Sequence, residues 1–165
     1  PCFSHIYGFV ASYLEEGLAC PLLLQIVEEF RSSLPRLLGD RPLTQAWAFK
    51  ALQGGKPIYC HTDDAEISLN FWLTPDIANR RPESGGMKIY KQLEPDDWSK
   101  MDYKNNQGRI KKFLDSEKVE CVTIPYRQNR AVLFKSRYFH ETDNPDFKSG
   151  YNNHRINITM LFGAE

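Results

Sequence analysis

The chain has 165 residues, of which 41% are hydrophobic and 13% aromatic, so it is long enough to bury one sizeable core. Lysine plus arginine and aspartate plus glutamate number 21 each, and this balance excludes a strong overall positive field that would attract nucleic acid. The sequence contains neither a long apolar run nor a signal-peptide pattern, so we expect no membrane span and a cytoplasmic location.

The four cysteines are Cys2, Cys20, Cys60 and Cys121, and no two of them form a C-x-x-C pair. Their wide spacing argues against a small disulfide framework and against a zinc ribbon. We therefore expect free thiols, as in a reducing compartment.

The N-terminal part of the chain is expected to be helical. Residues 1–20 carry apolar side chains at spacings that suit a short helix. Residues 21–38 show a stronger helical pattern, in which Pro21 suits the first turn and Gly39 suits a C-terminal cap. This pattern predicts a supporting helix that packs on a sheet.

After residue 42 the pattern changes to short apolar or alternating segments separated by turn residues, which predicts strands. Two of them, 119–126 and 130–135, flank the turn-like sequence 127–129 and are predicted to pair as a β-hairpin. The expected strands are 43–52, then 58–61 after a turn at 54–57, 66–74, 85–90, the two hairpin strands and 155–162.

A long polar excursion at residues 91–118 interrupts the strands and includes Trp98 and a predicted helix at 109–116. Long insertions between strands serve either as binding loops and lids or as cover for an exposed edge. Both readings remain open for this excursion.

Many short strands after one long helix predict a mainly β fold, either a sandwich or a barrel with a helical buttress. We expect a single domain over residues 1–165. Residues 1–40 would form the helical support and residues 43–165 the β core.

His61 and Asp63 are two residues apart in a predicted extended segment, so their side chains share one face. Asp64 and Cys60 have the opposite parity, which favours Asp63 as the carboxylate partner of His61. His140 follows an apolar strand, where a barrel can present a third ligand. Two imidazoles and one carboxylate can occupy one face of a metal ion and leave the opposite positions open.

Arg155 opens the last predicted strand, in which polar and apolar side chains alternate. Arg155, Asn157 and Thr159 would face a wet cavity, while the intervening residues would face a core. A guanidinium in such a cavity suits a carboxylate, because it can donate two parallel charge-assisted hydrogen bonds.

With a His-x-Asp pair, a distal His and an Arg-x-Asn-x-Thr strand in this order, the chain resembles the Fe(II)/2-oxoglutarate-dependent dioxygenase superfamily from about residue 43 onward. The resemblance implies a double-stranded β-helix, or jelly roll. It also implies Fe(II) bound by His61, Asp63 and His140. Residues 155–159 are similar to the nucleic-acid-repair branch, and 125–142 to the prolyl-hydroxylase-like branch.

The resemblance further implies that Arg155 binds the far carboxylate of 2-oxoglutarate. Tyr59 and Thr159 could donate hydroxyl groups to the cosubstrate, and Asn70 could contact one of its carboxylates. The implied reaction consumes molecular oxygen, hydroxylates a C–H bond, and releases succinate and carbon dioxide.

The substrate is expected to be a small metabolite or a peptide side chain, and nucleic acid is disfavoured by the balanced charge. An anionic substrate is favoured if basic side chains near His140 reach the mouth of the barrel. These residues, with a neighbouring tyrosine, are Lys135, Arg137, Tyr138 and Lys148.

Two other classes of protein remain open. A cupin-like metal enzyme without 2-oxoglutarate would also use two histidines and one aspartate. A non-catalytic jelly-roll binding module would keep the apolar alternation. Arg155 argues against the first class, and the complete set of candidate ligands argues against the second.

Overall fold

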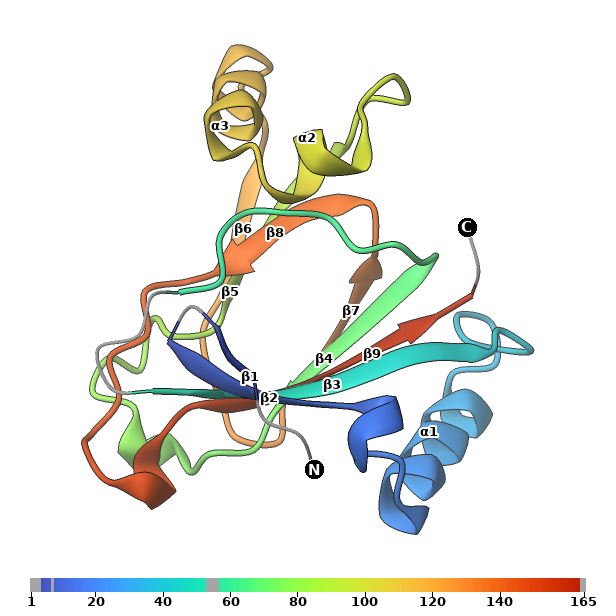
Figure 1. Cartoon of the computed structure of the whole chain (residues 1–165), viewed down its shortest axis with the longest axis vertical. Helices are drawn as coiled ribbons and strands as arrows, with labels where there is room; N and C mark the ends of the chain where they lie inside the picture. The colour runs from blue at the N-terminus through green and yellow to red at the C-terminus, as the bar shows by residue number, and fades with distance from the viewer. Residues whose placement is uncertain (1–3, 7, 53–56, 164–165) are drawn as a thin grey trace.

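The computed structural model describes residues 4–6, 8–52 and 57–163, and it is mainly β with antiparallel sheets (Figure 1). A larger sheet has the strand order β1-β2-β3-β9-β4-β7, and a smaller sheet has the order β6-β5-β8. The strands are Ser4–Ile6 (β1), Phe9–Tyr13 (β2), Leu43–Ala51 (β3), Ile67–Trp72 (β4), Met87–Leu93 (β5), Cys121–Ile124 (β6), Ala131–Lys135 (β7), Tyr138–Thr142 (β8) and Ile156–Phe162 (β9). The helices are Pro21–Ser33 (α1), Lys100–Lys104 (α2) and Gln107–Ser116 (α3), with single 3-10 turns at Leu14–Glu16, Asp76–Ala78 and Tyr151–Asn153.

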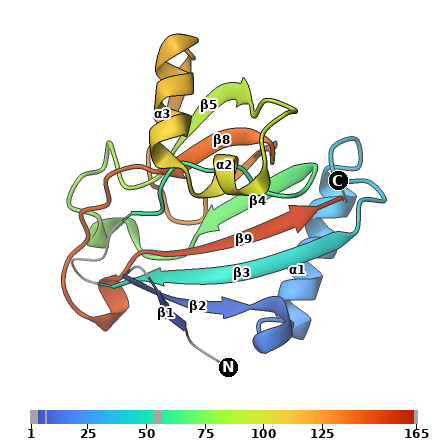
Figure 2. The ribbon, with the colours of Figure 1, turned by 45° about the horizontal axis from the view of Figure 1, so that its top comes forward.

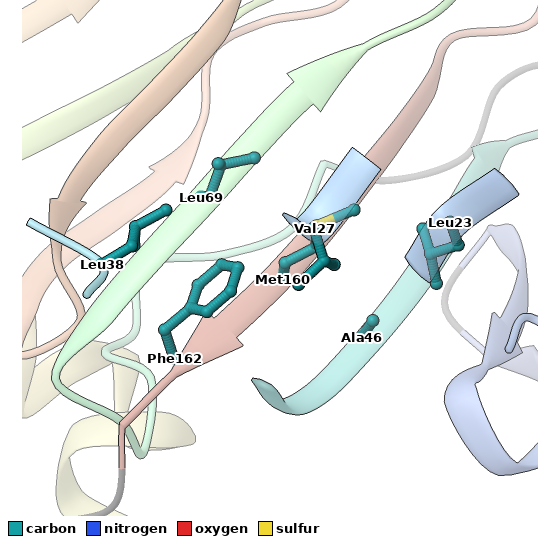
Figure 3. Packing of buried hydrophobic residues seen from close by; sticks show 7 residues of the cluster. All are labelled: Leu23, Val27, Leu38, Ala46, Leu69, Met160 and Phe162. Carbon is teal, nitrogen blue, oxygen red and sulfur yellow. The ribbon is translucent and has the colours of Figure 1, made fainter. Parts of the chain in front are cut away.

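Helix α1 covers the face of the larger sheet that points away from the smaller sheet (Figure 1). Its buried residues Leu23 and Val27 pack with side chains of β3, β4 and β9 in one apolar cluster (Figure 3). The sheet residues fully buried in that cluster are Ala46, Leu69, Met160 and Phe162.

The helix begins at Pro21 as predicted, but it ends at Ser33 rather than at residue 38. Leu34 leaves the helix with φ −129° because it precedes Pro35, whose ring disfavours the helical conformation of the residue before it. The chain then turns back at Gly39, where φ is 41° and a Cβ atom would lie 2.8 Å from the Pro35 carbonyl oxygen. This turn places Leu38 in the core beneath the helix.

The predicted helix in residues 1–20 is wrong, because this part of the chain forms β1 and β2. Strand β2 pairs antiparallel with β3 and extends the larger sheet. The ring of Phe9 lies 4.5 Å from that of Phe49, and the ring of Tyr13 lies 6.3 Å from it. Phe9 and Tyr13 are four residues apart in β2, so the alternation of side chains along a strand places both rings on one face of the sheet.

The predicted alternation in β4 and β9 is confirmed. Ile158, Met160 and Phe162 belong to the cluster beneath α1, whereas Asn157 and Thr159 face the smaller sheet and line a cavity between the sheets. On the inner face of the larger sheet, these polar side chains share the lining of that cavity with Trp47 and Phe49 of β3.

The predicted hairpin is wrong, because β6 pairs with β5 in the smaller sheet and β7 pairs with β4 in the larger sheet. The connection between them crosses from one sheet to the other. Tyr126 anchors this crossover, since its side chain is 5% exposed and its hydroxyl donates to the Thr74 carbonyl at 2.6 Å.

Segment 58–61 is not a continuous strand, but it lies along β8. His61 and His140 exchange two backbone hydrogen bonds of 3.0 and 2.9 Å, and the Thr142 amide donates to the Ile58 carbonyl at 3.0 Å. Residues 54–56 of the predicted turn at 54–57 lie outside the described part of the chain.

The excursion between β5 and β6 folds into α2 and α3 and lies beyond the smaller sheet (Figure 2). Helix α3 contains the predicted helix 109–116 and begins at Gln107, where the Asn106 side chain accepts a hydrogen bond from the Arg109 amide. The rings of Trp98 and Phe113 lie 6.0 and 6.1 Å from the ring of Phe139 in β8. The excursion thus packs on the outer face of the smaller sheet, which favours a covering role over a lid.

Two further expectations concern cysteines and membrane spans. Cys20, Cys60 and Cys121 are free thiols. Within the part of the chain that the structure describes, none of the helices has the length and apolar character needed to cross a membrane.

Candidate metal centre

The side chains of His61, Asp63 and His140 converge between the two sheets, with one ligand atom from each lying within 4.8 Å of the others. The Nε2 atom of His61 is 3.6 Å from Oδ1 of Asp63, and Nε2 of His140 is 3.4 Å from Oδ2. Pairing of the 58–61 segment with β8 brings the two imidazoles together, with ring centroids 4.3 Å apart. The predicted ligands therefore form one cluster.

Both imidazole rings are oriented by backbone carbonyl groups. Nδ1 of His61 lies 2.7 Å from the Tyr59 carbonyl oxygen, and Nδ1 of His140 lies 2.9 Å from the Tyr138 carbonyl oxygen. A carbonyl oxygen can only accept, so Nδ1 is the donor in each of these two contacts, and Nε2 is the ring atom that faces Asp63. This arrangement is typical of histidines that bind a metal through Nε2.

The carboxylate of Asp63 is buried and held by a serine. Ser68 in β4 donates to its Oδ2 at 2.7 Å, and the hydroxyl of Ser136 lies 2.9 Å from that of Ser68. Burial by itself would raise the pKa of Asp63, but the imidazoles of His140 and His61 hold that pKa well below its usual range. Asp63 is therefore ionised and ready to bind a cation.

The neighbouring carboxylate, Asp64, points away from the two histidines, as predicted from its position one residue after Asp63 in an extended segment. It forms ion pairs of 2.5 and 3.0 Å with Lys100 and Lys104 of α2. Cys60 also points away from the cluster and is buried with Phe139 against α3, where burial raises the pKa of its thiol. Neither residue competes with Asp63 and the two histidines.

Arg155 is 5% exposed and lies where the two sheets approach each other. Its Nε donates to the Gly85 carbonyl at 2.7 Å, one terminal nitrogen donates to the Gly86 carbonyl at 3.2 Å, and the other donates to Oδ1 of Asn157 at 2.8 Å. Gly86 lies against the 124–126 segment, where a Cβ would be 2.0 Å from the Ile124 carbonyl oxygen, so any side chain there would displace the backbone that carries this acceptor.

None of the acceptors around Arg155 among the described residues is a carboxylate. Burial lowers the pKa of Arg155 to about 10, partly offset by Tyr126, so the guanidinium is charged at neutral pH. A buried charge without a counterion is costly, and an added anion would relieve that cost.

Two adjoining cavities surround these groups. The inner cavity, of about 50 Å³, contains all three candidate ligands together with Arg155. The outer cavity, of about 320 Å³, shares five lining residues with it, and none of the three candidate ligands lines this second cavity. The shared residues are Phe49, Ile58, Thr142, Arg155 and Asn157.

The other predicted cosubstrate residues are placed differently. Asn70 and Thr159 line the inner cavity, and Oδ1 of Asn70 is buried without a hydrogen-bond partner among the described residues. The Tyr59 side chain is 48% exposed and lines neither cavity, although its carbonyl orients His61. The structure therefore brings Asn70 and Thr159, but not the Tyr59 hydroxyl, to the metal cluster.

Ser68 and Ser136 were not singled out from the sequence as site residues. Alternation in β4 indicates that Ser68 shares a face with Asn70, but it does not indicate which side chain Ser68 contacts. Ser136 follows β7 directly, and its carbonyl accepts from the Asp63 amide at 2.9 Å. Only the closed fold brings these two serines to Asp63.

The comparisons with known proteins rest on structure, because no protein-family model matches the sequence and no curated protein matches it. The chain resembles the non-heme alpha ketoglutarate dependent carbocyclase SnoK from nogalamycin biosynthesis, with 13% identity, a TM-score of 0.62, and 94% of this chain and 63% of that chain covered. It thus spans less than two thirds of the SnoK chain.

Two further solved structures are similar. HygX from Streptomyces hygroscopicus, with nickel and 2-oxoglutarate bound, is 12% identical with a TM-score of 0.59, covering 99% of this chain and 72% of that one. A prolyl-4-hydroxylase from Pseudomonas putida is 15% identical with a TM-score of 0.55, covering 97% and 71%. The chain therefore has the fold of Fe(II)/2-oxoglutarate-dependent oxygenases and carries a candidate His-Asp-His triad in it.

Proposed function

We propose that the chain is an Fe(II)- and 2-oxoglutarate-dependent dioxygenase. It hydroxylates a C–H bond of a small metabolite or peptide side chain and releases succinate and carbon dioxide. The observation that carries this proposal is that the His61, Asp63 and His140 triad and the uncompensated cation of Arg155 line one cavity.

The ligand set fits Fe(II). Two imidazole nitrogens and one carboxylate oxygen form the mixed set that non-heme iron oxygenases use, and it contains no thiolate. Iron held by these three residues would supply oxygen activation. The protein would hold Nε2 of both histidines toward the metal through the two carbonyl contacts at Nδ1.

Arg155 fits the far carboxylate of 2-oxoglutarate. Its three hydrogen bonds to Gly85, Gly86 and Asn157 use three N–H groups, and a guanidinium offers five, so two remain to bind both oxygens of a carboxylate. Asn70 and Thr159 line the same cavity and can add hydrogen bonds along the cosubstrate. The protein thereby orients the cosubstrate and keeps bulk water from its charged end.

We also propose that the β core is a double-stranded β-helix. With 58–61 counted beside β8, the strands after residue 43 pass between the two sheets in the order of that fold, with β5 and β6 consecutive in the smaller sheet. Strands β3, β4, β7 and β9 lie in the larger sheet, and the 58–61 segment, β5, β6 and β8 form the smaller layer. Such an order encloses a metal site between two sheets, as in other jelly rolls.

Succinate formation tests the proposal. Purified protein is incubated with Fe(II), 2-oxoglutarate and oxygen, and succinate is measured by NMR. We expect slow succinate formation without substrate, and none with the Asp63→Ala variant. A cupin-like metal enzyme or a binding module would bind metal or ligand without producing succinate above the level of that variant.

A further inference from the structure

The larger sheet extends past the smaller layer beside the metal cluster. The 58–61 segment forms the side of the smaller layer that lies beyond β8, since the other neighbour of β8 is β5. This segment faces β3, because His61 lines the inner cavity together with Trp47 and Phe49. Strands β2 and β1 continue the larger sheet beyond β3, and Figure 2 shows both clear of β5 and β8. The inner face of β2 therefore lies outside the space that the smaller layer covers.

Three aromatic side chains line this uncovered side of the site. Antiparallel pairing places Tyr13 opposite Trp47, and Trp47 opposite Thr159, so these side chains share the inner face of the sheet. The ring of Phe49 lies 6.0 Å from that of Trp47 and 6.3 Å from that of Tyr13. We call Tyr13, Trp47 and Phe49 the aromatic shelf. All three are only partly buried, so their rings offer apolar surface next to the metal cluster.

The exposed fractions of the candidate ligands indicate the side from which the cluster can be reached. The His61 side chain is 22% exposed, whereas those of Asp63 and His140 are 4% and 8% exposed. Because His61 lies on the segment that faces β3, the cluster is open toward the aromatic shelf. The inner cavity, of about 50 Å³, is much smaller than small-molecule sites of roughly 300 to 1,000 Å³. The body of a substrate must therefore lie outside it, with only the reacting group near the ligands.

The space beside the aromatic shelf offers no counterion to a charged substrate. In the inner cavity, the charged residues other than the candidate ligands are Arg155, which is assigned to the cosubstrate, and Glu141. The carboxylate of Glu141 accepts a hydrogen bond of 2.8 Å from Tyr90, which packs beneath α3. A charged group on the shelf would lose hydration without gaining an opposite charge. The inward-facing residues of β2 and β3 from Phe9 to Tyr13 and from Trp47 to Ala51 are Phe9, Ala11, Tyr13, Trp47, Phe49 and Ala51, and all are uncharged.

The basic residues near His140 do not line the inner cavity. Lys135 and Arg137 line a separate hollow, where Arg137 binds Glu94 at 2.5 Å. Lys148 lines the outer cavity, which contains none of the candidate ligands. The condition under which the sequence favoured an anionic substrate is therefore not met.

Two polar groups of the aromatic shelf remain for a ligand. Within the part of the chain that the structure describes, neither Nε1 of Trp47 nor the hydroxyl of Tyr13 makes a hydrogen bond. An indole N–H can only donate, and a phenol O–H can donate as well. Both groups suit a neutral acceptor such as a carbonyl oxygen.

The strand edges near the metal cluster favour a small molecule over a peptide, since peptides typically bind at an open strand edge or in an extended groove. The Cys60 carbonyl lies on the edge of the 58–61 segment that points away from β8, and Nε2 of Gln107 donates to it at 2.7 Å. On the larger sheet, the edge strand on this side is β1, which β2 separates from β3. Neither edge offers a peptide free backbone groups beside the cluster.

We propose that the aromatic shelf is the substrate-binding surface and that the substrate is a small, uncharged molecule with a cyclic body and an acceptor oxygen. This inference rests on the proposed oxygenase function and names the substrate class of that site. The cyclic body packs on the ring of Trp47, and its oxygen accepts from Nε1 of Trp47 or from the Tyr13 hydroxyl. One of its C–H bonds then lies on the side of His61.

The test measures binding by ligand-observed NMR to nickel-loaded protein saturated with 2-oxoglutarate, so that no turnover occurs. The probes are benzamide and cyclohexanecarboxamide, each compared with its matched acid and its matched amine. We expect at least one amide to bind about tenfold more tightly than both charged counterparts. The signals of its ring protons should broaden more with nickel-loaded than with zinc-loaded protein, because nickel is paramagnetic and broadens only nearby protons.

Trp47→Ala should weaken binding of that amide by about tenfold or more, the size expected for loss of an aromatic contact. Trp47→Phe keeps a ring but lacks the indole N–H, and should weaken binding by about fivefold. Trp98→Phe is the matched control, because Trp98 packs against Phe113 and Phe139 on the outer side of the smaller sheet. It should leave the affinity within about twofold. Nickel stoichiometry and melting temperature check that each variant is folded, and Trp47→Phe decides the test if the alanine variant is not.

The inference is overturned if neither amide binds, if a charged counterpart binds as tightly as its amide, or if nickel causes no added broadening. It is also overturned if Trp47→Phe and Trp98→Phe weaken binding equally, or if a peptide pool, but neither amide, stimulates succinate formation. Each of these results leaves the oxygenase proposal standing, since that proposal fails only when the protein makes no succinate from 2-oxoglutarate.

Discussion

The hydroxyl of Ser68 donates a hydrogen bond to Oδ2 of Asp63 at 2.7 Å, and both side chains are almost completely buried. Ser136 lies behind Ser68, with their hydroxyl oxygens 2.9 Å apart. A carboxylate held at one oxygen has a defined rotation, so Oδ1 remains for a metal ion. Ser68 is thus a positioning residue for the carboxylate of the triad.

We expect Ser68→Ala to weaken Mn(II) binding by about tenfold to a hundredfold, the range typical for loss of a group that orients a metal ligand. Electron paramagnetic resonance of bound Mn(II) should show a changed signal, which a purely structural role would not produce. Ser32→Ala, on the exposed face of α1, is the control and should bind Mn(II) as the wild type does.

The metal ligands can be tested one at a time. His61→Ala, Asp63→Ala and His140→Ala should each abolish stoichiometric binding of Fe(II), Mn(II) or Ni(II), because two ligands do not hold the ion at micromolar concentration. Elemental analysis of the dialysed proteins measures this. Asp64→Ala should keep its metal, because that carboxylate is bound to Lys100 and Lys104. Retention of metal by all three folded triad variants would mean that the site lies elsewhere.

Arg155→Ala should lose 2-oxoglutarate and keep the metal. Removal of one partner of a buried charged pair costs about 2–5 kcal/mol, so the affinity should fall by at least about thirtyfold. Calorimetry with nickel-loaded protein gives the affinity, and nickel stoichiometry shows whether the variant is folded.

Arg155→Lys should recover only part of this affinity, because an ammonium group lacks the planar fork of a guanidinium. Arg109→Ala, on the exposed side of α3, serves as the control and should bind 2-oxoglutarate normally. Unchanged affinity in Arg155→Ala would assign Arg155 a structural role only.

Trp98→Ala tests the role of the excursion at 91–118. The Trp98 ring lies 5.2 Å from Phe113 and 6.0 Å from Phe139, on the outer side of β8. Loss of this half-buried ring should lower the free energy of unfolding by about 2 kcal/mol, measured by urea denaturation, and leave nickel binding intact. Ile77→Ala, at a site that is 77% exposed, is the control and should change the free energy of unfolding by less than about 0.5 kcal/mol.

A lid would behave differently in the same experiment. If Trp98→Ala left stability unchanged but abolished stimulation of succinate formation by an added substrate, the excursion would act on the substrate. The position of Phe139 predicts the opposite result, because adjacent residues of a strand point to opposite faces and His140 occupies the face with the metal cluster.

The sequence by itself determined the features that depend on local periodicity. Alternation along β9 predicted that Asn157 and Thr159 face a cavity while Met160 faces a core, and both placements are confirmed. Parity in an extended segment also separated Asp63 from Asp64. These predictions succeed because the direction of a side chain in a strand follows from its position in the chain.

The tertiary structure alone decided which segments become neighbours. Residues 119–126 and 130–135 read as a hairpin, yet each pairs with a strand from a different sheet. Residues 1–20 have helical spacing, yet β2 forms because β3 offers it an edge to pair with. Contacts between distant segments, such as that of Ser68 with Ser136, depend on how the whole chain folds. Local sequence patterns do not determine such contacts.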